Sequence, residues 1–238
     1  MHDSHGFTWI STIPALHAFP MHVVTAVVVA VVLVATMIVA SAQHMKYLKN
    51  STGGLVPEKT VTFRNFFELV AENIFGLCET VMGRHEAAVY FPIVGTLFVF
   101  IFASNLLGLI PGFLPPTDNL NTTLALGTFV FIFYNYAGLK ANGISYLKHF
   151  LGPLLWLSPL MLVIEIASHV FRPISLALRL RGNIMGDHVV LGIFSQLVPW
   201  LLPVVFYGLG LFVAFVQAFV FCLMTMVYIS LSATHEEH

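Results

Sequence analysis

Five stretches of this sequence are apolar over the lengths that a bilayer crossing requires, and they constrain the fold more than any other feature. They cover about 23–42, 87–110, 122–139, 151–190 and 199–233. Roughly 20 apolar residues in a helix span the ~30 Å hydrocarbon core, and only helices or closed barrels satisfy their backbone polar groups inside lipid. We therefore predict an all-α, polytopic membrane protein, with residues 1–238 forming a single membrane domain.

The composition agrees with this interpretation and excludes several functional classes. Charged residues make up 9% of the chain and hydrophobic residues 58%, with a mean hydropathy of +0.89. Soluble domains carry about 25% charged residues. The net charge of −1 gives no electrostatic basis for binding nucleic acid. The two cysteines, Cys78 and Cys222, fall in different predicted helices without CxxC spacing, so we interpret both as small buried hydrophobic residues.

The segment of about 60–82 has a different pattern from the five apolar stretches. Its aromatic and aliphatic residues recur every three or four positions, while Arg64, Glu68, Glu72 and Glu79 share the other side. This pattern predicts an amphipathic helix that lies at the membrane surface. The alternative is a helix in the core of a soluble domain.

The segments 151–190 and 199–233 are much longer than a membrane crossing. A 40-residue helix measures about 60 Å, which is twice the thickness of the hydrocarbon core. We therefore expect these long helices to tilt strongly, bend or break, and Pro173 permits a bend inside the first of them. Together they should form a hairpin with its corner at about 196–199.

The basic residues between the apolar segments indicate the orientation. If 23–42, 87–110 and 122–139 each cross the membrane once, seven basic residues fall on the same side: Lys46, Lys49, Lys59, Arg64, Arg84, Lys140 and Lys148. The positive-inside rule assigns that side to the cytoplasm. We therefore expect the N-terminus outside and the C-terminus in the cytoplasm.

A polar stripe runs down the segment 151–190. When this segment is wound as one helix, seven polar or small residues fall within about 60° of Arg179, because their spacing alternates between three and four positions. These residues are Glu165, Ser168, Arg172, Ser175, Gly182, Asn183 and Gly186. Arg181 and His188 fall on nearly the opposite face. Charges inside a membrane cost roughly 2.5–3.5 kcal/mol on insertion scales and usually mark an ion or substrate path.

Arg179 is the centre of this stripe and a permanent cation, because arginine does not lose its proton in proteins. In a medium of low dielectric constant it attracts a carboxylate and favours the ionised form. Glu165 lies fourteen positions away, about 21 Å along a helix, so we expect the partner carboxylate to come from another chain. A structural ion pair with a helix of this same chain is the alternative. Small residues such as Gly182 and Gly186 let another helix approach closely, whether from a partner or from within the subunit.

Several motifs resemble those of one family. The segment RPISLALRLRGN around Arg179 is similar to the arginine motif of subunit a of F-type ATP synthases, the stator subunit beside the rotating ring of c subunits. NLLGLIPG at 105–112, PTDNLNTTLALG at 116–127 and the C-terminal VQAFVFCLMTMVYISLSATHEEH resemble further parts of that subunit, in the same order. The resemblance covers most of the chain from about residue 60 onward.

The resemblance implies a non-catalytic subunit that conducts protons, with the hairpin of long helices lying against the rotor ring. In the family, Arg179 faces the carboxylate of each passing c subunit, Asn183 accompanies it, and Gln217 lies opposite. Two aqueous half-channels deliver and release the protons. Further residues implied in proton translocation are Glu165, Ser168, Ser175, Asp187, His188 and Asn105, with Gly182 and Gly186 facing the rotor.

The same resemblance implies the surroundings of the chain. We expect it to contact the c ring, the b subunits of the peripheral stalk, the rest of the ATP synthase and the lipid of a bacterial cytoplasmic (inner) membrane. We expect no cofactor and no metal.

Two positions depart from the family's pattern. A partner residue often found seven positions before the glutamine of QAF is replaced by Gly210, and an acidic residue often found shortly after Asn105 is replaced by Gly108. Both changes affect the outer half-channel, where Asp187 can substitute for the missing partner.

Two other functional classes stay open from the residues alone. A self-contained transporter or channel would need an internal counter-charge for Arg179, and secondary transporters usually show inverted repeats; neither is evident in the sequence. A haem-binding oxidoreductase subunit would need histidine pairs at matched depth on facing helices, and an absorbance spectrum would detect it. The chain has no P-loop GxxxxGK[ST], so we expect no nucleotide chemistry in it.

Overall fold

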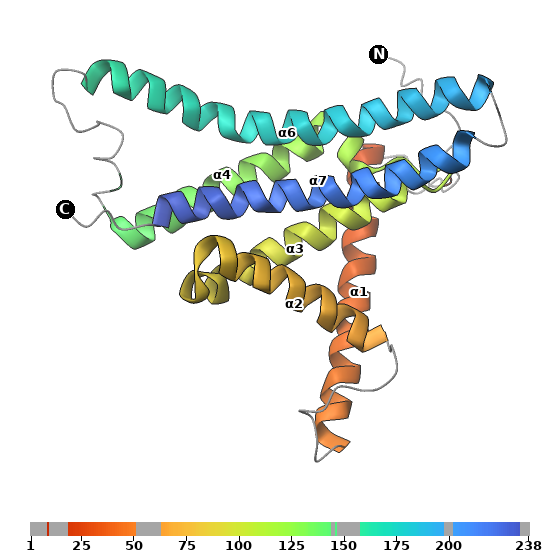
Figure 1. Cartoon of the computed structure of the whole chain (residues 1–238), viewed down its shortest axis with the longest axis horizontal. Helices are drawn as coiled ribbons and strands as arrows, with labels where there is room; N and C mark the ends of the chain where they lie inside the picture. The colour runs from red at the N-terminus through yellow and green to blue at the C-terminus, as the bar shows by residue number, and fades with distance from the viewer. Residues whose placement is uncertain are drawn as a thin grey trace.

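The computed structural model describes residues 9, 19–50, 63–143, 146, 158–197 and 202–233, and the regular elements in these ranges are helical (Figure 1). Five of the helices contain an apolar segment long enough to cross a membrane. The predicted all-α, polytopic membrane architecture is therefore confirmed. The helices are α1 (Met21–Asn50), α2 (Phe63–Met82), α3 (Arg84–Gly108), α4 (Leu120–Asn142), α6 (Ser158–Leu197) and α7 (Leu202–Ala233), with the short 3-10 helix η3 (Pro116–Asp118).

The helix ends differ from the predicted spans in one consistent way. α1 continues past the predicted end at 42 to Asn50, α4 continues past 139 to Asn142, and α6 continues past 190 to Leu197. Apolar runs identify the part of a helix that suits lipid, whereas the hydrogen-bonded helix extends into its polar flanks. The predicted start of the first long helix at 151 and part of the hairpin corner at 196–199 lie outside the described residues.

The two long helices lie side by side along the longest axis of the molecule, and α1 stands at a steep angle to them (Figure 1). α6 is a single helix of 40 residues with Pro173 inside it, and α7 has 32 residues. A helix of 40 residues is about 60 Å long, so α6 cannot stand upright in a ~30 Å core as α1 can. The steep angle between α1 and the two long helices agrees with the expectation that the long helices tilt strongly.

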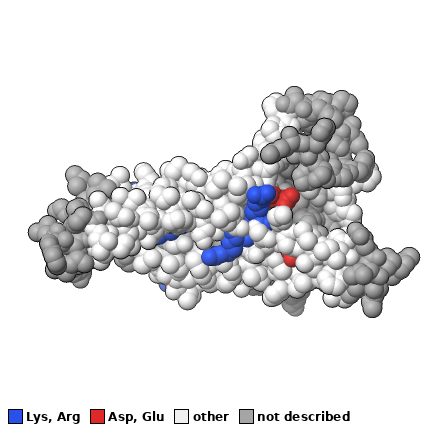
Figure 2. Space-filling view, turned by 90° about the horizontal axis from the view of Figure 1, so that it is seen from above, with Lys and Arg blue, Asp and Glu red and all other residues white. Residues whose placement is uncertain are grey.

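Charged side chains are rare on the face that α6 presents. Figure 2 views the molecule from this side, and basic atoms with a little acidic surface gather near the middle of an otherwise uncharged face. The large apolar side chains that α6 exposes include Val163, Phe171, Leu178 and Met185. An exposed apolar surface of this size is expected where lipid or another membrane helix covers it.

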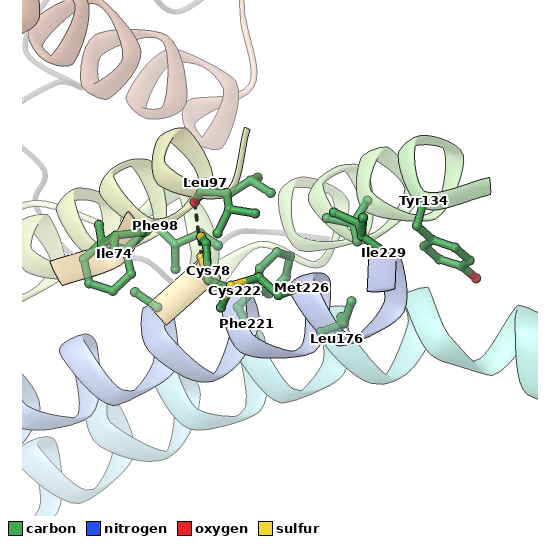
Figure 3. Close-up of a cluster of buried hydrophobic side chains, with 14 of the residues drawn as sticks. Ile74, Cys78, Leu97, Phe98, Tyr134, Leu176, Phe221, Cys222, Met226 and Ile229 are labelled. Carbon is green, nitrogen blue, oxygen red and sulfur yellow. Dashed lines mark hydrogen bonds between the residues drawn. The ribbon is translucent and has the colours of Figure 1, made fainter. Parts of the chain in front are cut away.

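The buried core joins α2, α3, α4, α6 and α7 (Figure 3). Its fully buried side chains include Ile101, Tyr134, Leu180 and Met226. Cys78 of α2 and Cys222 of α7 are both free and buried, as predicted, and the Cys222 thiol donates a hydrogen bond to the carbonyl oxygen of Val94 at 3.5 Å. This bond joins α7 to α3, and α2 packs against both helices in the same buried cluster.

α2 buries one side and exposes the other, as the pattern of 60–82 predicted. Ile74, Cys78 and Met82 are buried, whereas Glu72 and Glu79 are exposed. Phe66 was assigned to the apolar side but is 55% exposed, so the apolar surface of α2 is wider than the stripe that packs on α3. Gly83 ends the helix with a φ of 82°, a conformation that favours glycine and lets α3 begin at the next residue.

Helices α4 and α6 touch at a point where only glycine fits. A Cβ atom at Gly127 of α4 would lie 2.6 Å from the carbonyl oxygen of Pro173 in α6. Small residues allow such backbone approach between membrane helices. Because Pro173 is six residues from Arg179, this contact helps to set where Arg179 lies.

Candidate functional site

Most of the polar stripe of α6 lies on an exposed side of the helix. Arg179 and Ser175 are exposed, as are Ser168, Gly182, Asn183 and Gly186. The neighbouring side of the helix is buried against the rest of the chain and carries Leu176, Ala177, Leu180 and Ile184. Glu165 and Arg172 of the stripe are only partly exposed, so the stripe lies at the edge of the exposed side.

The glycines of this stripe have free space beside them. A Cβ atom added at Gly182 or at Gly186 would meet no atom of the described chain within 4 Å. These glycines are thus not used for packing inside the described part of the subunit, in contrast to Gly127.

Arg179 has no salt bridge among the residues that the structure describes. Glu165, the acidic residue on the same stripe, lies 3.8 Å from the guanidinium of Arg172 instead. Arg172 also lies over the rings of Tyr134 and Tyr228, at 5.9 and 5.3 Å from their centres. The two stripe arginines therefore differ: Arg172 is held by its own chain, whereas the charge of Arg179 is open to a partner.

A cavity of about 130 Å³ lies between α3, α6 and α7. This volume holds several water molecules, since one water needs about 10–15 Å³ on the same measure. Its lining brings together polar residues from the three helices, and the amide nitrogen of Asn183 donates a hydrogen bond to the side-chain oxygen of Gln217. The lining includes Asn105, Asn183, Asp187, Gln217, Gly108 and Gly210.

Asn105 is buried at one end of this cavity. Its side-chain oxygen accepts a hydrogen bond from the Thr117 hydroxyl at 2.8 Å. Its amide nitrogen is buried and has no hydrogen-bond partner among the described residues. A buried polar group normally has a partner, so this nitrogen is a suitable place for an ordered water.

Neighbouring side chains lie close to the two glycines that replace expected polar residues. A Cβ atom at Gly108 would lie 2.8 Å from Pro115, and one at Gly210 would lie 2.7 Å from Leu109. Neighbouring side chains therefore fill the space where an acidic residue or a second partner would otherwise project. Asp187 supplies the carboxylate of the cavity lining.

A second polar cluster, which was not predicted from the sequence, lies nearer the N-terminal end of α6. His169 is buried, and its Nε2 atom lies 3.0 Å from the side-chain oxygen of Asn135 in α4. The hydroxyl of Tyr146 lies 3.1 Å from the same oxygen and 3.4 Å from His169 Nε2. Asn135 was detectable as the amide inside a phenylalanine-rich span, but its partners depend on how the helices pack.

Other predicted residues are placed less fully. His188 belongs to α6, but its side chain lies outside the described residues. Ser168 and Ser175 face outward and do not line the cavity. Among the described side chains, no three His, Cys, Asp or Glu residues come together as metal ligands.

Comparison with known proteins determines the family. A family model described as "ATP synthase A chain" matches residues 21–230. The chain belongs to this family. ATP synthase subunit a of Bdellovibrio bacteriovorus is 44% identical over 232 residues, which covers 97% of this chain and 99% of that protein. ATP synthase subunit a 2 of Syntrophotalea carbinolica is 48% identical over 191 residues, covering 80% of each chain. ATP synthase subunit a of Geobacter sulfurreducens is 49% identical over 174 residues, covering 72% of this chain and 76% of that protein.

The family resemblance inferred from the motifs is thus confirmed. The match begins at residue 21, so it also includes α1, for which no motif was identified in the sequence. In this member of the subunit a family, the exposed Arg179 and the cavity that contains Asn183 and Gln217 both lie along the long helices α6 and α7.

Proposed function

We propose that this chain is the stator subunit of an ATP synthase membrane sector and carries protons to and from the carboxylates of a rotating c ring. The observation that carries the proposal is Arg179, an exposed cation at the centre of the α6 stripe with no salt bridge among the described residues. Membership of the ATP synthase subunit a family supports this role. Catalysis belongs to other subunits, and this chain needs no cofactor.

Arg179 keeps the two halves of the proton path apart. Its fixed positive charge repels a proton that would cross directly, and it favours the ionised form of a rotor carboxylate that approaches it. Each carboxylate therefore releases its proton before it passes Arg179 and takes up another afterwards. The driving energy is about 2.3 kcal/mol per charge for each 100 mV of membrane potential.

The cavity between α3, α6 and α7 serves as the outer half-channel. Water in the cavity connects Asn105 and Asp187 to the Asn183–Gln217 pair, which is one turn of helix from Arg179. His188 follows Asp187 in the chain and is the titratable group of this path, because histidine takes up and releases protons near neutral pH. Support comes from the polar side chains in an otherwise mainly apolar lining and from the amide nitrogen of Asn105, which has no partner among the described residues.

The inner half-channel opens at the N-terminal end of α6. Glu165 and Ser168 lie there, about three to four turns from Arg179, with Ser175 between them and the arginine. The positive-inside rule puts this end at the cytoplasm, the N-terminus outside and the C-terminus inside. The proposal places the chain in a bacterial cytoplasmic membrane, with the c ring against the stripe and the b subunits of the peripheral stalk elsewhere on the subunit.

Replacement of Arg179 tests the proposal. Arg179→Ala should reduce proton-driven ATP synthesis in membrane vesicles to background while the complex still assembles. Arg179→Lys should also fail largely, because a lysine can lose its charge when it is buried. Arg181→Ala is the matched control on the same helix and should keep most of the activity. Normal synthesis by an assembled Arg179→Ala complex would show that the mechanism is wrong.

A further inference from the structure

The cluster of His169, Asn135 and Tyr146 has a defined hydrogen-bond direction. The amide nitrogen of Asn135 donates to the carbonyl oxygen of Phe131 at 2.7 Å, so the side-chain oxygen is the acceptor. Both other contacts end on that oxygen: the Tyr146 hydroxyl at 3.1 Å and His169 Nε2 at 3.0 Å. His169 must therefore carry its proton on Nε2 in the neutral state, and Nδ1 is its basic nitrogen.

Charged and titratable side chains of α6, α4 and α7 surround His169. Glu165 and Arg172 lie one turn away on α6, Tyr134 of α4 meets the imidazole edge-on at 5.3 Å between ring centres, and Tyr228 of α7 lies behind Arg172. Arg172 and Glu165 lie 3.8 Å apart, so His169 lies beside an ion pair of its own helix.

We propose that His169, hydrogen-bonded to Asn135 and close to Tyr146, relays protons through the cytoplasmic half of the path. This inference rests on the proposed stator function. His169 lies ten residues from Arg179, about 15 Å along α6, and Tyr146 lies beyond the end of α4 on the side that the topology assigns to the cytoplasm. The cluster thus connects the depth of the rotor contact to the membrane surface.

The relay moves one proton at a time and returns to an equivalent state. A proton adds to Nδ1, the imidazolium releases its Nε2 proton to the hydroxyl oxygen of Tyr146, and Tyr146 gives its own proton to water. The Nε2 lone pair then faces the Asn135 oxygen, and this repulsion favours a half-turn of the ring that points Nδ1–H at that oxygen. Nε2 is then the basic nitrogen that accepts the next proton. Burial raises the pKa of Tyr146, with Arg172 acting in the opposite direction, so its hydroxyl stays protonated at neutral pH.

Passive proton conduction by the membrane sector tests the relay. Vesicles that carry the assembled complex, stripped of its water-soluble catalytic part, are given a potential, and proton flux per complex is measured at cytoplasmic pH 6 to 8. His169→Gln keeps a donor to Asn135 but cannot carry a proton, so flux should fall severalfold and lose most of its pH dependence. Tyr146→Phe keeps the ring and should give a similar loss. His85→Gln, at an exposed histidine of α3, is the matched control and should conduct normally.

The outcomes separate the relay from the broader proposal. A His169→Gln complex with normal proton flux and an unchanged pH profile would overturn the relay. The relay would also be overturned if His169→Gln lowered only the amount of assembled complex while the flux per complex stayed the same. If His169→Gln does not assemble, the flux of Tyr146→Phe decides. Arg179→Ala is measured in parallel: if it still supports synthesis, the stator mechanism itself is wrong, whereas failure of the relay variants to change flux leaves that mechanism intact.

Discussion

The contact between Gly127 and Pro173 predicts that a single methyl group far from any charge will disturb the stator site. In Gly127→Ala the added Cβ would lie 2.6 Å from the Pro173 carbonyl oxygen, whereas ordinary van der Waals contact begins near 3.4 Å. The two distances differ by 0.8 Å. A side-chain rotation cannot provide this extra separation, because the neighbouring atom belongs to the backbone. α4 and α6 must separate there by most of that distance.

Two opposing contributions determine how Gly127→Ala changes the stability of the subunit. Overpacking a helix contact costs about 1–3 kcal/mol, and alanine recovers up to about 1 kcal/mol through its higher helix propensity. We expect a net loss of about 1–2 kcal/mol in the stability of the subunit. The shift also moves the helix that carries Arg179, and displacements near 1 Å at a reacting site can reduce rates by about 100-fold.

The assay compares Gly127→Ala with Gly76→Ala, which places the same methyl group on α2 where no atom lies within 4 Å. Thermal unfolding of the purified complex and ATP synthesis in vesicles are measured for both. Gly127→Ala should unfold at a temperature a few degrees lower and synthesise ATP several-fold more slowly, whereas Gly76→Ala should match the unmodified protein or exceed its stability. Equal behaviour of the two variants would refute the reasoning from close backbone contact.

Three further results are expected. A cysteine at Gly182 should cross-link to cysteines on the outer helix of the c ring and one at Arg181 should not; equal yields from both would contradict the assigned contact face. A cysteine at 188 should react with a membrane-impermeant thiol reagent only from outside, and a cysteine at 165 only from the cytoplasm. Labelling of both from one side would contradict the half-channels. Burial raises the pKa of the Cys78 thiol to about 11, so only about 0.1% is thiolate at pH 8. Alkylation of Cys78 in the folded protein should therefore be slow and should accelerate about tenfold per pH unit up to that pKa; rapid labelling at pH 7 would show that α2 is not packed as described.

Helical periodicity was enough to place Arg179 and Gly182 on one side of α6. Arg179 and Gly182 are on one side because residues three or four positions apart share a face, and this holds whatever surrounds the helix. The apolar runs were equally reliable for the existence of the spans, because lipid requires them. These features depend on one segment at a time, which is why a single sequence contains them.

Features that join segments were not predictable in the same way. The sequence showed that Gly108 and Gly210 lack the expected polar side chains, but not that Pro115 and Leu109 fill the space beside them. His169 is adjacent to the stripe in sequence, yet its burial depends on α4. The hydrogen bond between Gln217 and Asn183 likewise depends on how α6 and α7 cross.

The open charge of Arg179 also has a consequence for the supply of this subunit in the cell. A copy that has not joined a rotor exposes a permanent cation to lipid, at a cost of roughly 2.5–3.5 kcal/mol on insertion scales. Within the described chain no carboxylate offsets that cost. If the proposed rotor contact covers Arg179, surplus copies are therefore less stable in the bilayer than assembled ones.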